Sequence, residues 1–116
     1  GKVNGILSIL IQAYYTAELL FNVPPNVFNP PPKVESSVIR LTRREKQTLD
    51  CNEKLFFRVV KTGYNHRRKT LRNSLKAMLG KIEIEDIIMK QRPEQLSVDE
   101  FVYLTNLVEK ALENQN

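Results

Sequence analysis

The chain contains one cysteine, Cys51, and no tryptophan among its 116 residues. A single thiol cannot form an internal disulfide, and no second cysteine or nearby histidine is present to complete a metal site. We interpret Cys51 as a structural thiol at the start of a helix, in a reducing, cytoplasmic compartment. The sequence therefore predicts neither a metal site nor a thiol nucleophile.

Long apolar runs and glycine-rich loops are also missing. The longest apolar run, residues 5–11, is interrupted by Ser8 and is far shorter than the ~20 residues that span a bilayer. The four glycines form no G-x-G loop, the motif that holds the phosphates of a nucleotide cofactor. We therefore expect no membrane partner and no glycine-rich nucleotide-binding loop in this sequence.

Acidic residues are absent between Glu53 and Glu83, whereas basic residues are concentrated there. From Arg40 to Lys76 there are twelve Lys or Arg residues and three Asp or Glu residues, although the net charge of the whole chain is only +5. A positive field confined to one third of the chain is typical of a protein that binds a polyanion.

The first part of the chain, residues 1–46, has the pattern of an incomplete α/β sheet. Helical spacing of Ile6, Leu7, Leu10, Ile11 and Tyr14 predicts a helix from Gly5 to Tyr15. Two β-branched or apolar runs, Leu19–Val23 and Val34–Thr42, predict strands on either side of a proline-rich loop. A lone hairpin is marginally stable in water, so we expect chain outside this sequence to cover it.

The second part, residues 47–116, has the pattern of a small all-helical domain. Asp50 and Glu53 have the spacing of a capping box, and Gly63 is the predicted end of that helix. A second helix is expected from about Lys69 to Leu79, and a short third around Ile84, Ile87 and Ile88. A last helix is expected from Ser97, which forms a full capping box with Glu100. The predicted fold class is thus mainly α, preceded by the last helix and two strands of an incomplete Rossmann-like sheet.

The basic segment of the second part is the strongest candidate for a binding surface. On a continuous helix, Arg68, Arg72 and Lys76 would stack at i, i+4 and i+8, with Leu71, Leu75 and Met78 turned toward the core. Evenly spaced cations suit a phosphate backbone. The competing interpretations are an ordinary solvated face and an anionic membrane surface. The predicted nucleic-acid-binding residues are Arg67, Arg68, Lys69, Arg72 and Lys76.

The loop between the two strands is the second candidate. Pro30 and its two following prolines would hold Phe28 on a stiff turn, with Lys33 close by. Aromatic side chains on rigid loops stack on flipped or single-stranded bases. From composition alone, a turn with a packed aromatic is the competing interpretation.

These segments carry a resemblance to a known family. Val23–Leu41 resembles the late target-recognition motif of the rRNA adenine N6,N6-dimethyltransferases, the KsgA-type small-subunit enzymes and their erythromycin-resistance relatives. His66–Leu75 is similar to the C-terminal helical domain of the KsgA type, as are Gln12–Tyr15 and Arg92–Ser97. The resemblance implies that this chain is the C-terminal portion of a larger enzyme.

The resemblance also implies a reaction and a division of labour. The parent enzyme would transfer methyl groups from S-adenosylmethionine to two adjacent adenines near the 3′ end of small-subunit rRNA, within a pre-30S particle. Phe28 occupies the position that flanks the flipped adenine, and Pro30 and Lys33 shape the same rim. The basic helix beside this loop would bind rRNA. The cofactor-binding residues and the catalytic residues would lie outside this chain, and the chain alone would be inactive.

Two other functions remain open at this point. A free-standing helical nucleic-acid-binding adaptor would use the same basic segment without a catalytic parent. A structural fragment would carry the basic residues only for solubility. Exposed strand edges would also allow the chain to associate with a second copy.

Overall fold

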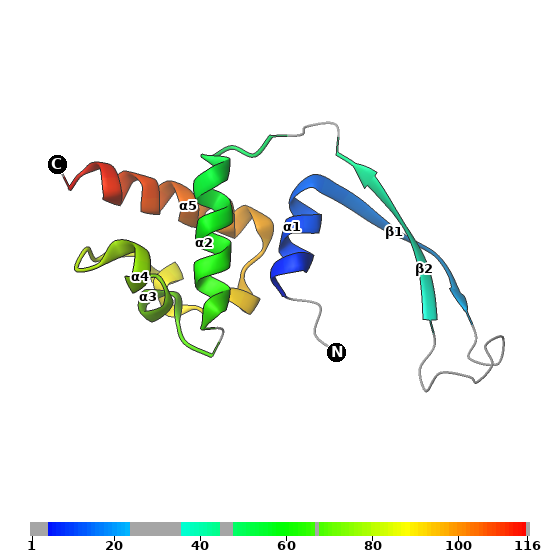
Figure 1. Ribbon diagram of the computed structural model, residues 1–116, viewed down its shortest axis with the longest axis horizontal. Coiled ribbons are helices and arrows are strands. Elements are labelled where there is room, and N and C mark those ends of the chain that lie inside the picture. The colour runs from blue at the N-terminus through cyan, green and yellow to red at the C-terminus, as the bar shows by residue number, and fades with distance from the viewer. Residues whose placement is uncertain (1–4, 24–35, 45–47, 67, 116) are drawn as a thin grey trace.

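The computed structural model describes residues 5–23, 36–44, 48–66 and 68–115. They form a helical body and a two-stranded antiparallel sheet, as Figure 1 shows. The principal extents are 61 × 33 × 19 Å, and the sheet occupies one end of the long axis. The predicted mainly helical class, with a small sheet after the first helix, is confirmed.

The sheet consists of β1, Tyr15–Val23, and β2, Ser36–Arg43. The two strands pair from Tyr15 opposite Arg43 to Val23 opposite Ser36, with an irregularity between Leu19 and Phe21. One additional residue in β1 at this point makes a bulge, which increases the local twist. β1 begins four residues earlier than the predicted strand, because it follows the first helix without a loop.

In the middle of the sheet the two faces differ in polarity. Glu18 lies opposite Arg40 in the register, and their side chains form an exposed ion pair at 3.6 Å. Ile39 and Leu41 alternate with Arg40 and therefore lie on the other face, where both remain about half exposed. The apolar face of the hairpin is thus not covered by any part of the chain that the structure describes.

Helix α1, Ile6–Tyr14, packs against the helical body rather than standing apart with the sheet. Ile9 and Ala13 are its buried residues and belong to the common core. Of the residues whose spacing predicted this helix, Ile6, Leu10 and Tyr14 pack against the core, whereas Leu7 is 67% exposed. Apolar residues surround this short helix, so periodicity alone could not select the side that the body covers.

Helices α2, Glu53–Asn65, and α5, Val98–Glu113, cross to form the centre of the body (Figure 1). The rings of Tyr64, near the end of α2, and Phe101, in the first turn of α5, stack with their centroids 6.0 Å apart. Most of the fully buried side chains come from these two helices. They include Phe56, Val59, Val60, Phe101, Leu104 and Val108.

The starts of these two helices test the capping predictions. Ser97 Oγ accepts from the Glu100 backbone N–H at 3.2 Å, and Glu100 Oε1 accepts from the Ser97 N–H at 3.0 Å, so the predicted capping box is confirmed. The box predicted at Asp50 was wrong. The N-cap of α2 is Asn52, whose Oδ1 accepts from the Leu55 N–H at 3.0 Å.

Gly63 does not end α2, contrary to the prediction. The helix continues to Asn65, and Gly63 is buried within it. A methyl group on Gly63 would lie 3.2 Å from Leu71 Cδ2 and 3.8 Å from Pro93 Cβ. The missing side chain therefore provides the space in which the following segments pack on α2.

The predicted helix from about Lys69 to Leu79 is two short helices, α3, Leu71–Ser74, and α4, Lys76–Leu79. Leu75 separates them, with ψ at 0° instead of the ~−42° of an α-helix. The predicted third helix is a 3₁₀ turn, η2, Ile87–Lys90, followed by η3, Pro93–Gln95. In η2, Ile88 is buried, but Ile87 is 79% exposed.

Candidate functional site

The cationic surface is defined here by Arg68, Lys69, Arg72 and Lys76. Arg72 is partly buried and the other three side chains are exposed. The remaining predicted site residues, Phe28, Pro30, Lys33 and Arg67, lie outside the described residues. The structure therefore places four of the five predicted RNA-binding residues and none of the predicted loop residues.

The cationic surface is not a single helical stripe. Arg68 and Lys69 precede α3, Arg72 belongs to α3, and Lys76 opens α4. The stacking of Arg68, Arg72 and Lys76 on one continuous helix was wrong, because the helix starts after Arg68 and is interrupted at Leu75. Leu71 and Leu75 are nevertheless fully buried, so the predicted core side of the segment is confirmed.

Three hydrogen bonds fix the segment that carries these cations. The Leu71 N–H donates to the Gln91 carbonyl oxygen at 2.8 Å and ties α3 to η2. The His66 carbonyl oxygen accepts from the Lys69 N–H at 2.8 Å and from Ser74 Oγ at 3.2 Å. Because Ser74 is buried, its hydrogen bond stabilises this turn from the core side. The backbone that carries the cations is therefore fixed in position.

The cations fall into two groups around separate hollows. Arg68 and Lys69 line a shallow one together with Asn65 and His66. Arg72 and Lys76 line a groove of about 440 Å³ that also receives Lys81. Lys81 was not among the predicted residues. The sequence signal that could have found it is its position directly after Gly80, the residue at which α4 ends.

The cations have no acidic partner in the described part of the chain. There, the salt bridge within 4.0 Å is the one between Arg40 and Glu18, far from this surface. Cations that already form ion pairs have less free energy to gain from a phosphate. The four side chains are therefore available to an external anion.

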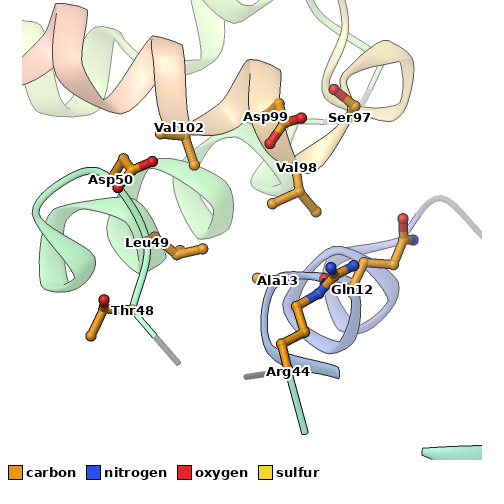
Figure 2. A pocket seen from close by; sticks show the side chains of 10 residues that line it. All are labelled: Gln12, Ala13, Arg44, Thr48, Leu49, Asp50, Ser97, Val98, Asp99 and Val102. Carbon is orange, nitrogen blue, oxygen red and sulfur yellow. Dashed lines mark hydrogen bonds between the residues drawn. The ribbon is translucent and has the colours of Figure 1, made fainter. Parts of the chain in front are cut away.

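A third hollow, about 460 Å³ in volume, lies where α1 meets the segment after β2 and the start of α5 (Figure 2). Arg44 stabilises this junction with two hydrogen bonds to α1. Its Nε donates to the Gln12 carbonyl oxygen at 3.0 Å, and its backbone N–H donates to the Tyr14 carbonyl oxygen at 2.9 Å. Val98 and Asp99 face the hollow from α5 (Figure 2). This mixture of side chains suits a packing junction between segments rather than a reaction centre.

Cys51 lies just before the N-cap of α2 and is partly buried. Burial raises the pKa of its thiol, and the carboxylates of Glu53, Glu109 and Asp50 raise it further. A raised pKa leaves little of the nucleophilic thiolate at neutral pH. The environment of Cys51 therefore agrees with the structural role predicted for it.

Metal and membrane binding can be examined for the described residues only. Within them, no three His, Cys, Asp or Glu side chains gather closely enough to hold a metal ion. None of the described helices is both long and apolar enough to cross a bilayer.

The cationic surface is distant from the strand ends along the molecule. The ends of β1 and β2 that adjoin residues 24–35 lie at one end of the long axis, and α3 and α4 lie at the other (Figure 1). The prediction that the basic segment lies beside this loop concerns residues 24–35, which are outside the described residues. Helices α1, α2 and α5 lie between the described strand ends and the cationic surface. An RNA contacted at both ends must extend across the body.

Comparison with known proteins gives consistent relatives. A family profile described as "Ribosomal RNA adenine dimethylase" matches residues 1–110. "Ribosomal RNA small subunit methyltransferase A" of Bacteroides thetaiotaomicron is 60% identical over 97% of this chain, which covers 43% of that protein. The protein of the same name from Flavobacterium johnsoniae is 59% identical over 94% of this chain and 42% of its own length. The chain thus spans less than half the length of these relatives.

Solved structures agree at the level of the fold. The crystal structure of a dimethyladenosine transferase from Plasmodium falciparum matches 92% of this chain and 49% of its own, with a TM-score of 0.67 at 20% identity. The structure of the 23S rRNA methyltransferase ErmE matches 90% of this chain and 46% of its own, with a TM-score of 0.58 at 19% identity. With the profile covering nearly every residue, the chain belongs to the ribosomal RNA adenine dimethylase family.

Proposed function

We propose that this chain is the C-terminal part of an S-adenosylmethionine-dependent rRNA adenine N6,N6-dimethyltransferase, and that its helical body binds small-subunit rRNA. The observation that carries the proposal is the cationic surface, which is anchored by buried Leu71 and Ser74 and has no acidic partner among the described residues. Such a surface gains free energy by releasing counterions from a nucleic acid. We propose the reaction by analogy with the relatives, which are named as rRNA methyltransferases.

The rest of the enzyme would supply the cofactor site. S-adenosylmethionine would bind the part of the protein that corresponds to the uncovered length of the relatives. Phe28, Pro30 and Lys33 would line the seat of the target adenine, one of two adjacent adenines near the 3′ end of the rRNA. The substrate would be a pre-30S particle in the cytoplasm, and this chain alone would be inactive.

The finer fold assignment rests on the uncovered face of the hairpin. Ile39 and Leu41 are exposed on it, and two strands alone seldom form a stable sheet. We assign β1 and β2 to a Rossmann-like sheet that continues outside this chain. The division into residues 1–46 and 47–116 then separates a part of the catalytic domain from an RNA-binding domain. The shared core, to which Ile9 of α1 contributes, makes the contact between them close.

The test uses the full-length enzyme, a small-subunit rRNA fragment and S-adenosylmethionine carrying a labelled methyl group. The triple variant Arg68→Glu, Arg72→Glu and Lys76→Glu should weaken rRNA binding and lower the salt dependence of log K by about one unit for each phosphate that the variant no longer neutralises. A matched control reverses the same number of charges elsewhere. It carries Lys54→Glu, Arg58→Glu and Lys110→Glu.

The two readouts address different parts of the proposal. Retained rRNA affinity in the triple variant, or an equally large decrease in the control, would overturn the assignment of the cationic surface. Absence of methyl transfer to rRNA adenines by the unmodified enzyme would overturn the reaction.

A further inference from the structure

The groove beside α4 is built by a reversal of the chain. Gly80 has φ at +61°, a conformation that favours glycine, and its N–H donates to the Lys76 carbonyl oxygen at 2.8 Å. The Ile82 N–H then donates to the Leu79 oxygen at 3.0 Å. Residues 81–84 thereby return alongside α4, and the space between them is the groove of about 440 Å³.

The groove combines an apolar floor with a charged rim. Leu79, Ile84 and Met89 line it, and all three are buried core residues. The charged lining residues are Arg72, Lys76, Lys81 and Glu83. The rim therefore has a net positive charge, with one carboxylate among three cations.

Each of these features excludes some anions. Inorganic phosphate or a lipid headgroup would use the cations, but it would leave the apolar floor uncovered. A paired stretch of RNA presents phosphates, but its bases are stacked within the helix. An unpaired nucleotide presents both a base with an apolar face and two flanking phosphates.

We propose that this groove seats one unpaired nucleotide of the rRNA, with its base over the floor formed by Leu79, Ile84 and Met89 and its phosphates against Arg72, Lys76 and Lys81. The groove volume falls within the ~300–1,000 Å³ of ordinary ligand sites. Glu83 only accepts hydrogen bonds when ionised, so it favours a base that carries an amino group. The inference rests on the proposed function, since it names the RNA feature that the cationic surface recognises.

The test compares three RNA hairpins bound to the full-length enzyme. One has a fully paired stem, one has a single bulged adenosine, and one has an abasic residue at the bulge. We expect the bulged adenosine to be bound at least fivefold more tightly than either of the others, because only it supplies both base and distorted backbone. Equal affinity for the adenosine and the abasic bulge would overturn the inference.

Two variants separate the contributions of floor and rim. Ile82→Asp, which changes a lining residue beside the floor and adds one negative charge, should abolish the preference for bulged adenosine and weaken binding of the paired hairpin no more than Lys81→Gln does. Lys81→Gln should weaken binding of all three hairpins and lower the salt slope by about one. The matched control is Ile87→Asp, which changes an exposed isoleucine outside the groove and should keep the preference.

The outcomes distinguish this inference from the proposed function. Failure of the enzyme to bind any hairpin at low salt would count against both. Binding of all hairpins without a preference would overturn the nucleotide site alone. Displacement of RNA by an acidic Glu–Tyr copolymer, abolished in Ile82→Asp, would instead identify the groove as a peptide site and overturn the inference.

Discussion

The hydroxyl of Tyr14, the last residue of α1, donates a 2.6 Å hydrogen bond to Oε1 of Glu53, the first residue of α2. Burial raises the pKa of Tyr14 to about 12, and the hydrogen bond and the negative charge of Glu53 act in the same direction. This contact fastens the helix that precedes the hairpin to the helical body.

The raised pKa of Tyr14 predicts how this contact depends on pH. The ordinary pKa of tyrosine is ~10. Because the pKa is higher in the folded chain, the stabilisation is present below pH ~10 and is lost as the pH rises toward 12. Tyr14→Phe should lower the free energy of unfolding by about 1 kcal/mol at pH 8.

Urea denaturation at pH 8 and pH 11.5 checks this prediction. The difference between the unmodified chain and Tyr14→Phe should shrink at the higher pH. Tyr15→Phe is the matched control, because the Tyr15 hydroxyl has no hydrogen-bond partner among the described residues. An equal decrease in stability in both variants at pH 8 would contradict the role of the Tyr14–Glu53 contact.

The capping box of α5 predicts that removal of a single hydroxyl lowers stability. Ser97→Ala should cost about 1 kcal/mol, because the Glu100 N–H loses its acceptor at the start of a helix. Ser97→Asp should restore most of the stability, since aspartate is an equally good N-cap. Chemical denaturation of the three proteins provides the comparison, and a failure of Ser97→Asp to recover would show that the hydroxyl has some role besides capping.

The close approach at Gly63 predicts that a larger side chain is poorly tolerated. Gly63→Val should destabilise the chain by about 1–3 kcal/mol, because the new methyl groups would push into buried Leu71. Lys61→Val places the same β-branched residue at an exposed position of the same helix and controls for helix propensity. Thermal unfolding midpoints that fall equally in both variants would refute the packing explanation.

The environment of Cys51 predicts a slow thiol. Its raised pKa reduces the thiolate fraction at pH 8, and partial burial limits access. Reaction with 5,5′-dithiobis(2-nitrobenzoate) should therefore be slower in the folded chain than in the urea-unfolded chain. The measurement is unambiguous because the chain has one cysteine. Equal rates in the two states would mean that the thiol is neither shielded nor perturbed.

Features of the fold encoded by local chemistry were predictable from the sequence. Ser97 and Glu100 have the spacing of a capping box and form one. The buried faces of α2 and α5 follow their helical periodicity, and the two apolar runs around the proline-rich loop pair as antiparallel strands. In each case residues near one another in the chain determine the outcome, so a single sequence is sufficient.

Features that depend on distant contacts were not predictable in the same way. Gly63 signals a helix end, but its missing side chain makes room for Leu71, eight positions later in the chain. The break at Leu75 keeps Leu71, Leu75 and Leu79 buried, so the apolar pattern is the same as that of an unbroken helix. The groove was missed for a similar reason. Lys81 lines the same groove as Arg72 because the chain reverses at Gly80.

The 61 Å long axis, with the sheet at one end and α3 and α4 at the other, has a consequence for affinity. If both ends contact the same rRNA, the second contact forms at a high effective concentration once the first is made. That gain depends on a match between the length of the protein and the spacing of the two RNA segments. Correctly folded RNA would therefore be bound through avidity, whereas the same nucleotides in a misfolded strand would be held through one end only.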